Sequence, residues 1–233
     1  MKTNLFEISV IALMVAGGFS SCTKEGEGLE CDCKDELYYY NYEEKIFLVD
    51  RSNFLNDWLF VGFETQVQND EIVRYIHQTG LFKSVDVKKI YRPNPNSPVF
   101  KDMYNYVFVK TKKPKTCSQF KEIIRILEKE PMVTLVNFVF CQWDSPNCKD
   151  IMSFSEYFNV KVKDKDDLSD LYTIVQETNT LILSKNEFRP EWISIRANKH
   201  SKGDALQMAN FFHETGKFVA ISYGFWATGS ALD

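Results

Sequence analysis

The sequence has few of the residues and motifs on which enzyme active sites depend. It contains three histidines, His77, His200 and His213, and it lacks a nucleophile elbow, a zinc-protease helix, a phosphate loop and a dinucleotide fingerprint. His77 and His213 fall near the ends of expected helices, where the helix dipole favours a histidine without any catalytic role. His200 lies just before an expected helix start, where it would be solvated. Acidic residues are many but scattered, so we expect no catalytic activity and no cofactor.

An excess of positive charge is also missing. The 233 residues include 28 Lys and Arg against 32 Asp and Glu, which gives a formal net charge of −4. Such a chain offers no basic field for phosphates, so nucleic acid is not an expected partner. The hydrophobic share of 44% and the charged share of 26% are ordinary for a globular protein with one large core or two small ones.

The longest apolar run near the N-terminus, residues 8–19, is too short to span a bilayer. Lys2 gives the run a weakly positive start, and small residues precede Cys22. This arrangement resembles a bacterial lipoprotein signal, whose cleavage leaves a lipidated cysteine at the new N-terminus. We expect a signal peptide over residues 1–21 and a lipid anchor on Cys22. The alternative is a simple secretory signal with an incidental cysteine.

Residues 22–36 are polar and acidic after Cys22, and this composition predicts a solvated tether between the lipid and the fold. Several acyl chains on Cys22 would hold the protein firmly, because a single chain binds membranes only reversibly. Lys24 and Glu25 are similar to the short charged signals that send some Gram-negative lipoproteins to the outer face of the outer membrane. The expected location is therefore the cell envelope, at the outer membrane and exposed at the surface.

Five cysteines follow Cys22, which is an odd number. The Cys31-Asp32-Cys33 motif has no second cysteine or histidine pair at a matching spacing, so it does not make a zinc site, and we expect no metal. In an exported protein these cysteines are expected to form structural disulfides with one left over. Cys141 and Cys148 are the best local pair, whereas the pairing of Cys31, Cys33 and Cys117 stays open.

Residues 201–225 repeat the pattern of residues 116–140 without a gap. Both segments carry apolar residues at the i, i+3, i+4 and i+7 spacing of one helix face. These positions are Phe120, Ile123, Ile124 and Leu127 in the first copy and Ala205, Met208, Ala209 and Phe212 in the second. The helices are expected to open at Thr116 or Ser118 and at Ser201 with Asp204, and to close at Pro131 and Gly216. An apolar strand follows each helix, so the architecture is duplicated.

Each half reads as β-α-β-β-α-β, the ferredoxin-like succession, which makes the fold α+β with two tandem modules. Expected strands cover residues 57–64, 82–90, 104–111 and 132–140 in one half and 154–163, 180–185, 191–196 and 217–225 in the other. Asn69 is expected to cap the first helix, and Asp166 a helix carrying Leu168, Leu171, Tyr172 and Val175. Residues 37–50 suggest an N-terminal β-hairpin. The predicted domains are residues 37–143 and 154–233, joined by a linker at 144–153.

Both final strands of the repeat carry apolar residues on their two faces, as if each sheet were covered twice. The cover could be intramolecular, with the halves or the hairpin covering each other, or it could be a partner protein. The tyrosine run at residues 38–40 leaves a similar choice. It could stack on carbohydrate, but packing within a strand is the better explanation.

Four groups of residues resemble the N-terminal region that precedes the catalytic domain in certain large bacterial subtilisin-type serine peptidases. They are residues 38–40 with 44–48, residues 177–180, residues 203–210 and residues 212–216. The resemblance spans most of residues 37–226. It implies ferredoxin-like propeptide modules, which help the protease to fold and occlude its active site through the sheet and a C-terminal tail.

Two features depart from that family. The sequence contains no Asp-His-Ser catalytic domain, so a peptidase would be met as a separate chain. Residues 220–223 stand where an acidic-proline turn is usual in the family's last strand.

The resulting hypothesis is a non-catalytic lipoprotein that acts through protein contacts, as an inhibitor or folding chaperone of a subtilisin-type peptidase. Tyr223, Phe225 and Trp226 are the predicted interaction anchors, because aromatic residues concentrate interface energy. A rival hypothesis is a surface lipoprotein that binds glycan or a small ligand in a cleft between the modules. A third is a structural remnant of a protein that lost its catalytic domain.

Overall fold

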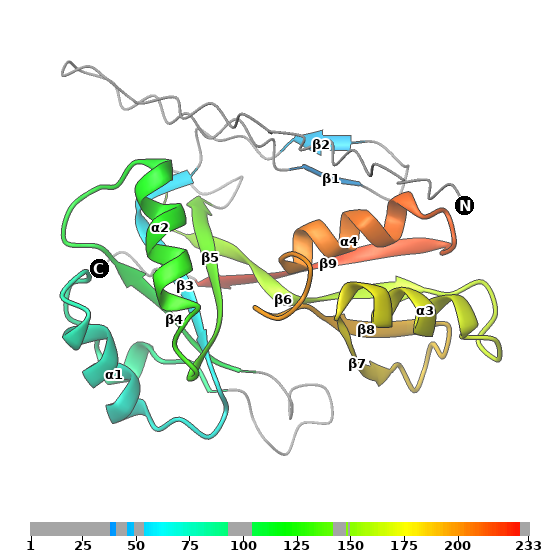
Figure 1. Cartoon of the computed structure of the whole chain (residues 1–233), viewed down its shortest axis with the longest axis horizontal. Helices are drawn as coiled ribbons and strands as arrows, with labels where there is room; N and C mark the ends of the chain where they lie inside the picture. Colours follow the sequence, from blue (N-terminus) through cyan, green and yellow to red (C-terminus); the bar gives the residue numbers. More distant parts are fainter. Residues whose placement is uncertain are drawn as a thin grey trace, which may run out of the picture. The chain divides into compact units, whose positions relative to one another are not determined.

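The computed structural model shows a mixed α+β protein with four helices and an antiparallel sheet in its described part (Figure 1). It describes residues 38–40, 46–48, 54–92, 104–141, 148 and 150–228. The chain divides into two compact units, residues 1–30 and 31–233, and every described residue belongs to the second. Within that unit, residues 54–141 are here named the first half and residues 151–228 the second half. The α+β class expected from the sequence is confirmed.

The first half places three long strands in one antiparallel sheet. Its elements are β3 (Phe54–Phe63), α1 (Asn69–Gln78), the 3-10 helix η2 (Val87–Lys89), β4 (Asn105–Lys110), α2 (Cys117–Leu127) and β5 (Val133–Cys141). β3 pairs with β4 on one side and with β5 on the other. Phe82 forms an isolated antiparallel bridge with Thr111, just past the end of β4. The order across the sheet is therefore β5, β3, β4 and then Phe82.

The strand predicted over residues 82–90 is wrong beyond Phe82. Residues 87–89 form η2, and the Asp86 side chain accepts a hydrogen bond from the backbone N–H of Lys88 at 2.9 Å. Val85 and Val87 alternate with charged residues as they would in a strand. A short acidic side chain can nevertheless satisfy a nearby backbone donor and so favour a turn over the ladder.

The second half repeats the arrangement with a complete set of strands. Its elements are β6 (Ile151–Lys161), α3 (Ser169–Thr178), β7 (Leu181–Lys185), β8 (Trp192–Arg196), α4 (Ala205–Glu214) and β9 (Ala220–Thr228). β6 pairs antiparallel with β8 and β9, and β8 pairs antiparallel with β7. The order is β9, β6, β8, β7, which matches β5, β3, β4 and Phe82 of the first half. β6 begins at Ile151, inside the predicted linker.

The two helices of the sequence repeat begin in the same way. At α2, the Thr116 hydroxyl accepts the backbone N–H of Gln119, and the Gln119 side chain accepts the backbone N–H of Thr116. Asp204 and Gln207 form the same reciprocal pair at α4, so the cap there is Asp204 and not Ser201. Each capping box satisfies two backbone donors that a helix start would otherwise leave without partners. The duplication therefore extends to the local chemistry of the helix ends.

The other two helices correct the predicted caps. Gln68, not Asn69, precedes the first residue of α1, and its side chain makes no capping hydrogen bond. At α3, Asp167 rather than Asp166 accepts the backbone N–H of Ser169, at 3.0 Å. Tyr172 of α3 is 59% exposed, so the predicted apolar face is rotated toward Leu171 and Ile174.

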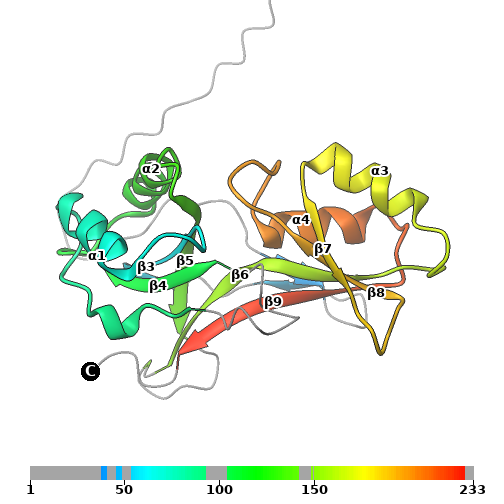
Figure 2. The same ribbon diagram turned by 90° about the horizontal axis from the view of Figure 1, so that it is seen from below.

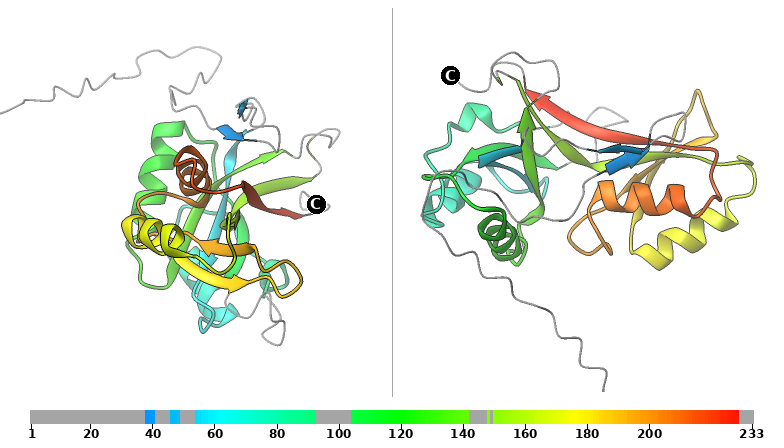
Figure 3. Two further views of the ribbon diagram at one scale, coloured as in Figure 1. Left: turned by 90° about the vertical axis from the view of Figure 1, so that its right-hand side faces the viewer. Right: turned by 90° about the horizontal axis from the view of Figure 1, so that it is seen from above.

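Each half has its own core between two helices and one face of its strands. Figure 2 shows α1 and α2 on one side of β3, β4 and β5, and Figure 3 shows α3 and α4 together against the second half's strands. All four apolar positions predicted for α4 are buried, as are three of the four predicted for α2, with Ile124 partly buried. The cores contain Leu59, Val61, Phe63, Phe120 and Leu127 in the first half, and Phe158, Val160, Ile193, Ala209 and Phe212 in the second.

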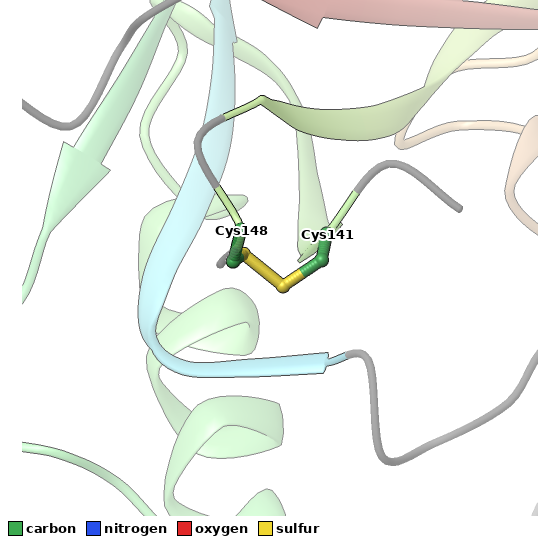
Figure 4. Close-up of a disulfide and its surroundings, with 2 residues drawn as sticks. All are labelled: Cys141 and Cys148. Atoms are coloured by element: carbon green, nitrogen blue, oxygen red, sulfur yellow. A yellow bond between two sulfur atoms is a disulfide. The ribbon is translucent and has the colours of Figure 1, made fainter. Parts of the chain in front are cut away.

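The two halves share strand β6. β5 pairs with its first residues, Ile151 and Met152, while β8 pairs with residues 157–161 farther along. Cys141 and Cys148 form a disulfide beside this pairing (Figure 4), as the sequence spacing predicted. The loop before α4 adds a second connection, because the Lys199 backbone N–H donates to the Thr134 carbonyl oxygen at 3.2 Å.

The predicted N-terminal hairpin is confirmed. β1 (Tyr38–Tyr40) pairs antiparallel with β2 (Ile46–Leu48). Tyr40 stacks on His213 of α4 with ring centres 3.9 Å apart, and its hydroxyl donates to Glu214 Oε1 at 2.9 Å. The hairpin is thus held against α4 by side chains. These contacts agree with the explanation preferred from the sequence, that the tyrosine run packs within the protein.

Candidate functional site

The second half presents one strand face that none of the described helices covers. Phe158, Val160 and Ile193 point into the core under α3 and α4, so their strand neighbours point the opposite way. The open face, as it is named from here on, comprises Tyr157, Asn159 and Lys161 of β6, Trp192, Ser194 and Arg196 of β8, and Ala220, Ser222, Gly224 and Trp226 of β9. All of these residues are half-buried. The face is therefore an accessible surface of small and polar groups around two tryptophans.

The corresponding face of the first half is mostly closed, although Trp58 and Phe108 on it stay half-buried. Phe60, Tyr106, Leu135 and Val139 are each at most 8% exposed, and they pack with Ile151 and Trp226 of the second half. The ring centres of Trp226 and Tyr106 are 4.5 Å apart. The prediction that β5 is covered on both faces is confirmed, and part of the cover is intramolecular.

The same prediction for the last strand of the second half is wrong. Phe218 lies before β9 begins and stacks on Phe212, with ring centres 5.4 Å apart. Within β9, Ile221 faces the core, whereas Ser222 pairs with Asn159 on the open face. β9 therefore alternates between apolar and small residues. The sequence pattern looked two-sided because it counted residues that precede the strand.

β6 is irregular where the open face meets the first half. Its pairing with β9 stops at Phe154 and resumes at Phe158, so residues 155–157 bulge out of the ladder. Gly224 lies against this bulge, and a Cβ atom there would collide with Ser155 Oγ and with the backbone oxygen of Tyr157. The backbone oxygen of Glu156 nevertheless keeps a partner, because it accepts the N–H of Ala197 at 2.8 Å.

The Glu156 side chain is buried in the seam between the halves. We define this seam as Glu156, Arg196, Trp226 and Tyr104. Glu156 is 3% exposed, and its Oε2 accepts the indole N–H of Trp226 at 3.3 Å. The Arg196 guanidinium lies 4.8 Å from the ring centre of Tyr104, in a cation–π contact. A carboxyl group, a guanidinium and aromatic rings thus meet beside the open face.

Burial is the main influence on protonation in the seam. It raises the pKa of the Glu156 carboxyl group above its ordinary value, since the charged form loses hydration. Hydrogen bonds from its own backbone N–H and from Trp226, the charge of Arg196, and the Tyr104 backbone N–H oppose this effect without cancelling it. The pKa of the Tyr157 hydroxyl is also raised, first by burial and then by the negative charge of Glu156.

The structure separates the three predicted interaction anchors. Tyr223 and Phe225 lie on the helix side of β9, where Tyr39 of β1 packs edge-on against both rings, at 5.5 and 6.5 Å. The Tyr223 hydroxyl donates to Asn210 Oδ1 at 2.7 Å and accepts the backbone N–H of Tyr40 at 3.1 Å. These two aromatic residues thus serve the internal packing, whereas Trp226 lies on the open face.

A cleft of about 350 Å³ lies on the helix side, between elements of both halves. It is lined by Lys121, Ile124, Arg125 and Glu128 of α2, by Leu135, Val136, Asn137 and Phe138 of β5, and by Asn198, Lys199, Ser201, Gly203, Asp204 and Gln207 before and within α4. Phe138 is its single aromatic lining residue. The cleft lies where the sequence analysis placed a ligand site, between the two halves. Its lining lacks the several aromatic side chains on which a sugar would stack.

Two acidic residues of the cleft, Asp204 and Glu128, have raised pKa values. Burial raises the pKa of the Asp204 carboxyl group. The pKa of Glu128 is raised first by burial and then by the charge of Asp204, while Lys199 opposes the effect. Lys199 Nζ donates to the Glu130 carbonyl oxygen at 2.7 Å, so this lysine also connects the two halves.

Several sequence predictions fall outside the described residues. They concern the signal peptide over residues 1–21, the lipid anchor Cys22, the tether, Cys31, Cys33 and the end of the C-terminal tail. Cys117 is also in a disulfide, and its partner is not a described cysteine because Cys141 and Cys148 pair with each other. The described part of the chain contains no cluster of three potential metal ligands. None of its helices has the length and apolar character needed to cross a membrane.

Sequence reasoning missed Glu156, Arg196 and Trp192 as members of a site. Trp192, Ser194 and Arg196 alternate with Ile193 and Ile195, so the sequence did contain the signal for a polar strand face. Glu156 had no such signal, because its position depends on the bulge in β6.

In the comparisons with known proteins, no protein-family model and no curated protein sequence matches this chain.

Proposed function

We propose that this chain is a non-catalytic lipoprotein of the cell envelope that binds a protein partner through the open face. The observation that carries the proposal is an accessible strand face with two tryptophans, in a half whose helices all lie on the other side. Tryptophan is enriched among the residues that dominate binding energy. Small residues such as Ala220 and Ser222 leave room between the tryptophans for a partner's side chains.

The proposal treats each half as a ferredoxin-like module. Supporting this, the strand order β9, β6, β8, β7 and the order β5, β3, β4, Phe82 both follow a βαββαβ succession with two helices on one face. The resemblance to propeptides of subtilisin-type peptidases supplies the class of partner. On this hypothesis the chain meets such a peptidase as a separate protein and inhibits it or assists its folding.

The test is to capture partners from the native envelope with the mature chain and then to assay inhibition of a subtilisin-type peptidase. Replacing Trp192 and Trp226 with Ala should weaken binding at least about tenfold, the size expected for central aromatic anchors. Trp58→Ala is the matched control, because Trp58 is half-buried like Trp192 and Trp226 but lies on β3 of the first half, outside the open face. Equal losses in all variants, or a peptidase that is neither retained nor inhibited, would count against the proposal.

The cleft supports a second candidate function, the binding of a small ligand between the modules. Its lining combines an apolar floor of Ile124, Val136 and Phe138 with charged groups from α2 and from the loop before α4. Ile124→Trp should fill the cleft and abolish ligand binding while peptidase binding at the open face remains. Thermal-shift screening of the wild-type chain and of Ile124→Trp with glycans and small metabolites would distinguish the two functions. A ligand of the cleft should stabilise the wild-type chain and not the variant.

The lipid anchor is tested separately. Replacing Cys22 with Ala should move the protein from the membrane fraction to the soluble fraction, since stable attachment depends on its acyl chains. Continued membrane partitioning of this variant would show that another feature holds the protein there.

A further inference from the structure

Exposed apolar side chains gather at the edge where the sheet of the second half ends. β7 is the outermost strand there, and none of the described strands pairs with its outer edge (Figure 1). We propose that this edge binds an extended segment of a partner protein, apolar and with one acidic residue, which adds a strand to the sheet. The proposal concerns a different surface from the open face and does not depend on a peptidase being the partner.

Four of the nine large apolar side chains that are exposed among the described residues lie on or beside β7. Leu181 and Ile182, within the strand, are 45% and 37% exposed. Tyr172 of α3 is 59% exposed, and Phe188, in the turn after β7, is 94% exposed. Scattered exposed apolar residues are ordinary on a protein surface, whereas a group of them along an unpaired strand edge marks an interaction site.

α3 directs its exposed tyrosine toward this edge. The Asp170 carboxylate accepts a hydrogen bond from Lys217 Nζ at 2.8 Å, and Lys217 lies just before β9, so this flank of α3 points toward β9. Two residues along a helix rotate the side chain by about 200°, which places Tyr172 on the opposite flank. β9 and β7 are the two ends of the second half's strand order, so that flank faces β7. Ile182 points to the same side of the sheet, because it pairs with the core residue Ile195.

The other end of the sheet is covered. β4 is the last strand on that side, and two isolated bridges, Phe82 with Thr111 and Tyr91 with Tyr106, lie along its outer edge. Phe82 occupies the position equivalent to β7 and is 4% exposed. The two halves therefore treat the same edge differently, and the second presents a five-residue strand whose outward backbone groups can accept another strand.

The register of β7 disfavours a second copy of this chain as the occupant. Leu181 pairs with Arg196 and so points to the side of the open face, whereas Lys185 pairs with Ile193 and points to the helix side. An irregularity in the register within β7 causes this change of side. Antiparallel self-pairing about the middle of the strand would set Leu181 opposite Lys185, with the two side chains on different faces. A separate partner segment has no such constraint.

The side chains of β7 indicate the composition of the partner segment. Leu181 and Ile182 favour apolar residues opposite them, and Lys185 favours an acidic residue. Lys185 Nζ donates to the carbonyl oxygen of Lys165 at 3.0 Å, which positions the ammonium group near the end of the strand. An ammonium group has three donors, so a carboxylate of the partner can bind it as well. Backbone hydrogen bonds would supply affinity and these side-chain pairs selectivity.

The first experiment selects ten-residue peptides from a random library with the immobilised mature chain and measures their dissociation constants by fluorescence anisotropy. We expect the selected peptides to alternate apolar with other residues and to contain an acidic residue. Ile182→Lys should weaken their binding at least about tenfold, because a charge on an edge strand opposes pairing. Val219→Lys is the matched control, since Val219 is 55% exposed but lies before β9, and this variant should bind as the wild type does.

A charge reversal at Lys185 provides the second experiment. Lys185→Glu should weaken the binding of an acidic peptide about fivefold, the size of one cross-strand charge pair. A peptide in which lysine replaces the acidic residue should recover binding to Lys185→Glu. Recovery identifies the pairing and cannot arise from a misfolded variant.

Three results would overturn the proposal. They are a selection that yields no peptide, peptides that bind Ile182→Lys as tightly as the wild-type chain, and a dimer in sedimentation that Ile182→Lys dissociates, which would place a second copy at the edge. Replacing Trp192 and Trp226 with Ala should leave peptide binding unchanged. Failure of the open face and failure of the β7 edge are therefore distinguishable.

Discussion

The two halves have the same strand order but differ in the strand face that lies opposite their helices. In the first half this face carries Phe60, Tyr106 and Leu135, and it is buried against residues of the second half. In the second half the equivalent face carries Asn159, Ser194 and other half-buried small or polar residues. Two halves with the same strand order thus differ, because the first buries its second face in the junction and the second leaves the equivalent face half-buried.

The largest expected effect tests this contrast directly. Phe60→Ala should lower the free energy of unfolding by about 3–5 kcal/mol, since it removes a fully buried ring and leaves a cavity. Trp192→Ala on the open face should cost only about 1 kcal/mol, roughly half of the contribution of a fully buried side chain. Urea unfolding of the two variants gives the comparison. Similar losses of unfolding free energy in the two variants would mean that the open face is as buried as the corresponding face of the first half.

The next effect concerns the disulfide that joins the end of β5 to the start of β6. Replacing both Cys141 and Cys148 with Ser should cost about 2–3 kcal/mol, from the loop entropy that the bridge removes from the unfolded chain. Hydrogen exchange should rise first at Ile151 and Met152, which pair with β5. Protection of Phe212 in the second core should change less. Uniform loss of protection would show that the halves unfold together.

The sequence predicted the repeated units of this fold better than their junction. The helix faces of residues 116–127 and 201–212, the hairpin and the Cys141–Cys148 disulfide depend on neighbours in the chain, and all were found as expected. The pairing of β5 with β6 and the burial of Glu156 depend on contacts between distant segments. Local periodicity carries no information on such contacts, so it could not show which half would keep an accessible face.

A smaller effect is expected at the bulge that separates the two faces. Gly224→Ala places a methyl group against Ser155 Oγ and the Tyr157 backbone oxygen, and backbone cannot move away cheaply. We expect a loss of about 1–3 kcal/mol, the usual cost of overpacking, together with a shifted indole ¹H–¹⁵N NMR signal of Trp226. Gly216→Ala is the control, because it has a positive φ of 65° but open space around a Cβ atom, so it should strain the backbone without moving Trp226. An unchanged indole signal in Gly224→Ala would show that the bulge in β6 does not determine the position of Trp226.

The smallest expected effect compares the two sides of the junction. Glu128 lies on the helix side, where burial and the charge of Asp204 raise its pKa, so its neutral form is the one that the folded protein favours. Glu128→Gln should therefore stabilise the protein at neutral pH by about 0.5 kcal/mol after allowance for solvent screening, and the gain should vanish below the unfolded pKa of glutamate. Denaturant unfolding at neutral and acidic pH measures the difference.

Glu122 provides a control of opposite sign on the same helix. Arg125 hydrogen-bonds to the Glu122 carboxylate at 2.6 Å and holds its pKa below the ordinary value, so Glu122→Gln should reduce stability at neutral pH and have no effect once the pH falls below the folded pKa. If Glu128→Gln also destabilises the protein, the attraction between the Glu128 carboxylate and Lys199 outweighs burial and the charge of Asp204. The helix side would then be held together by ion pairing, in contrast to the desolvated carboxyl group of the seam.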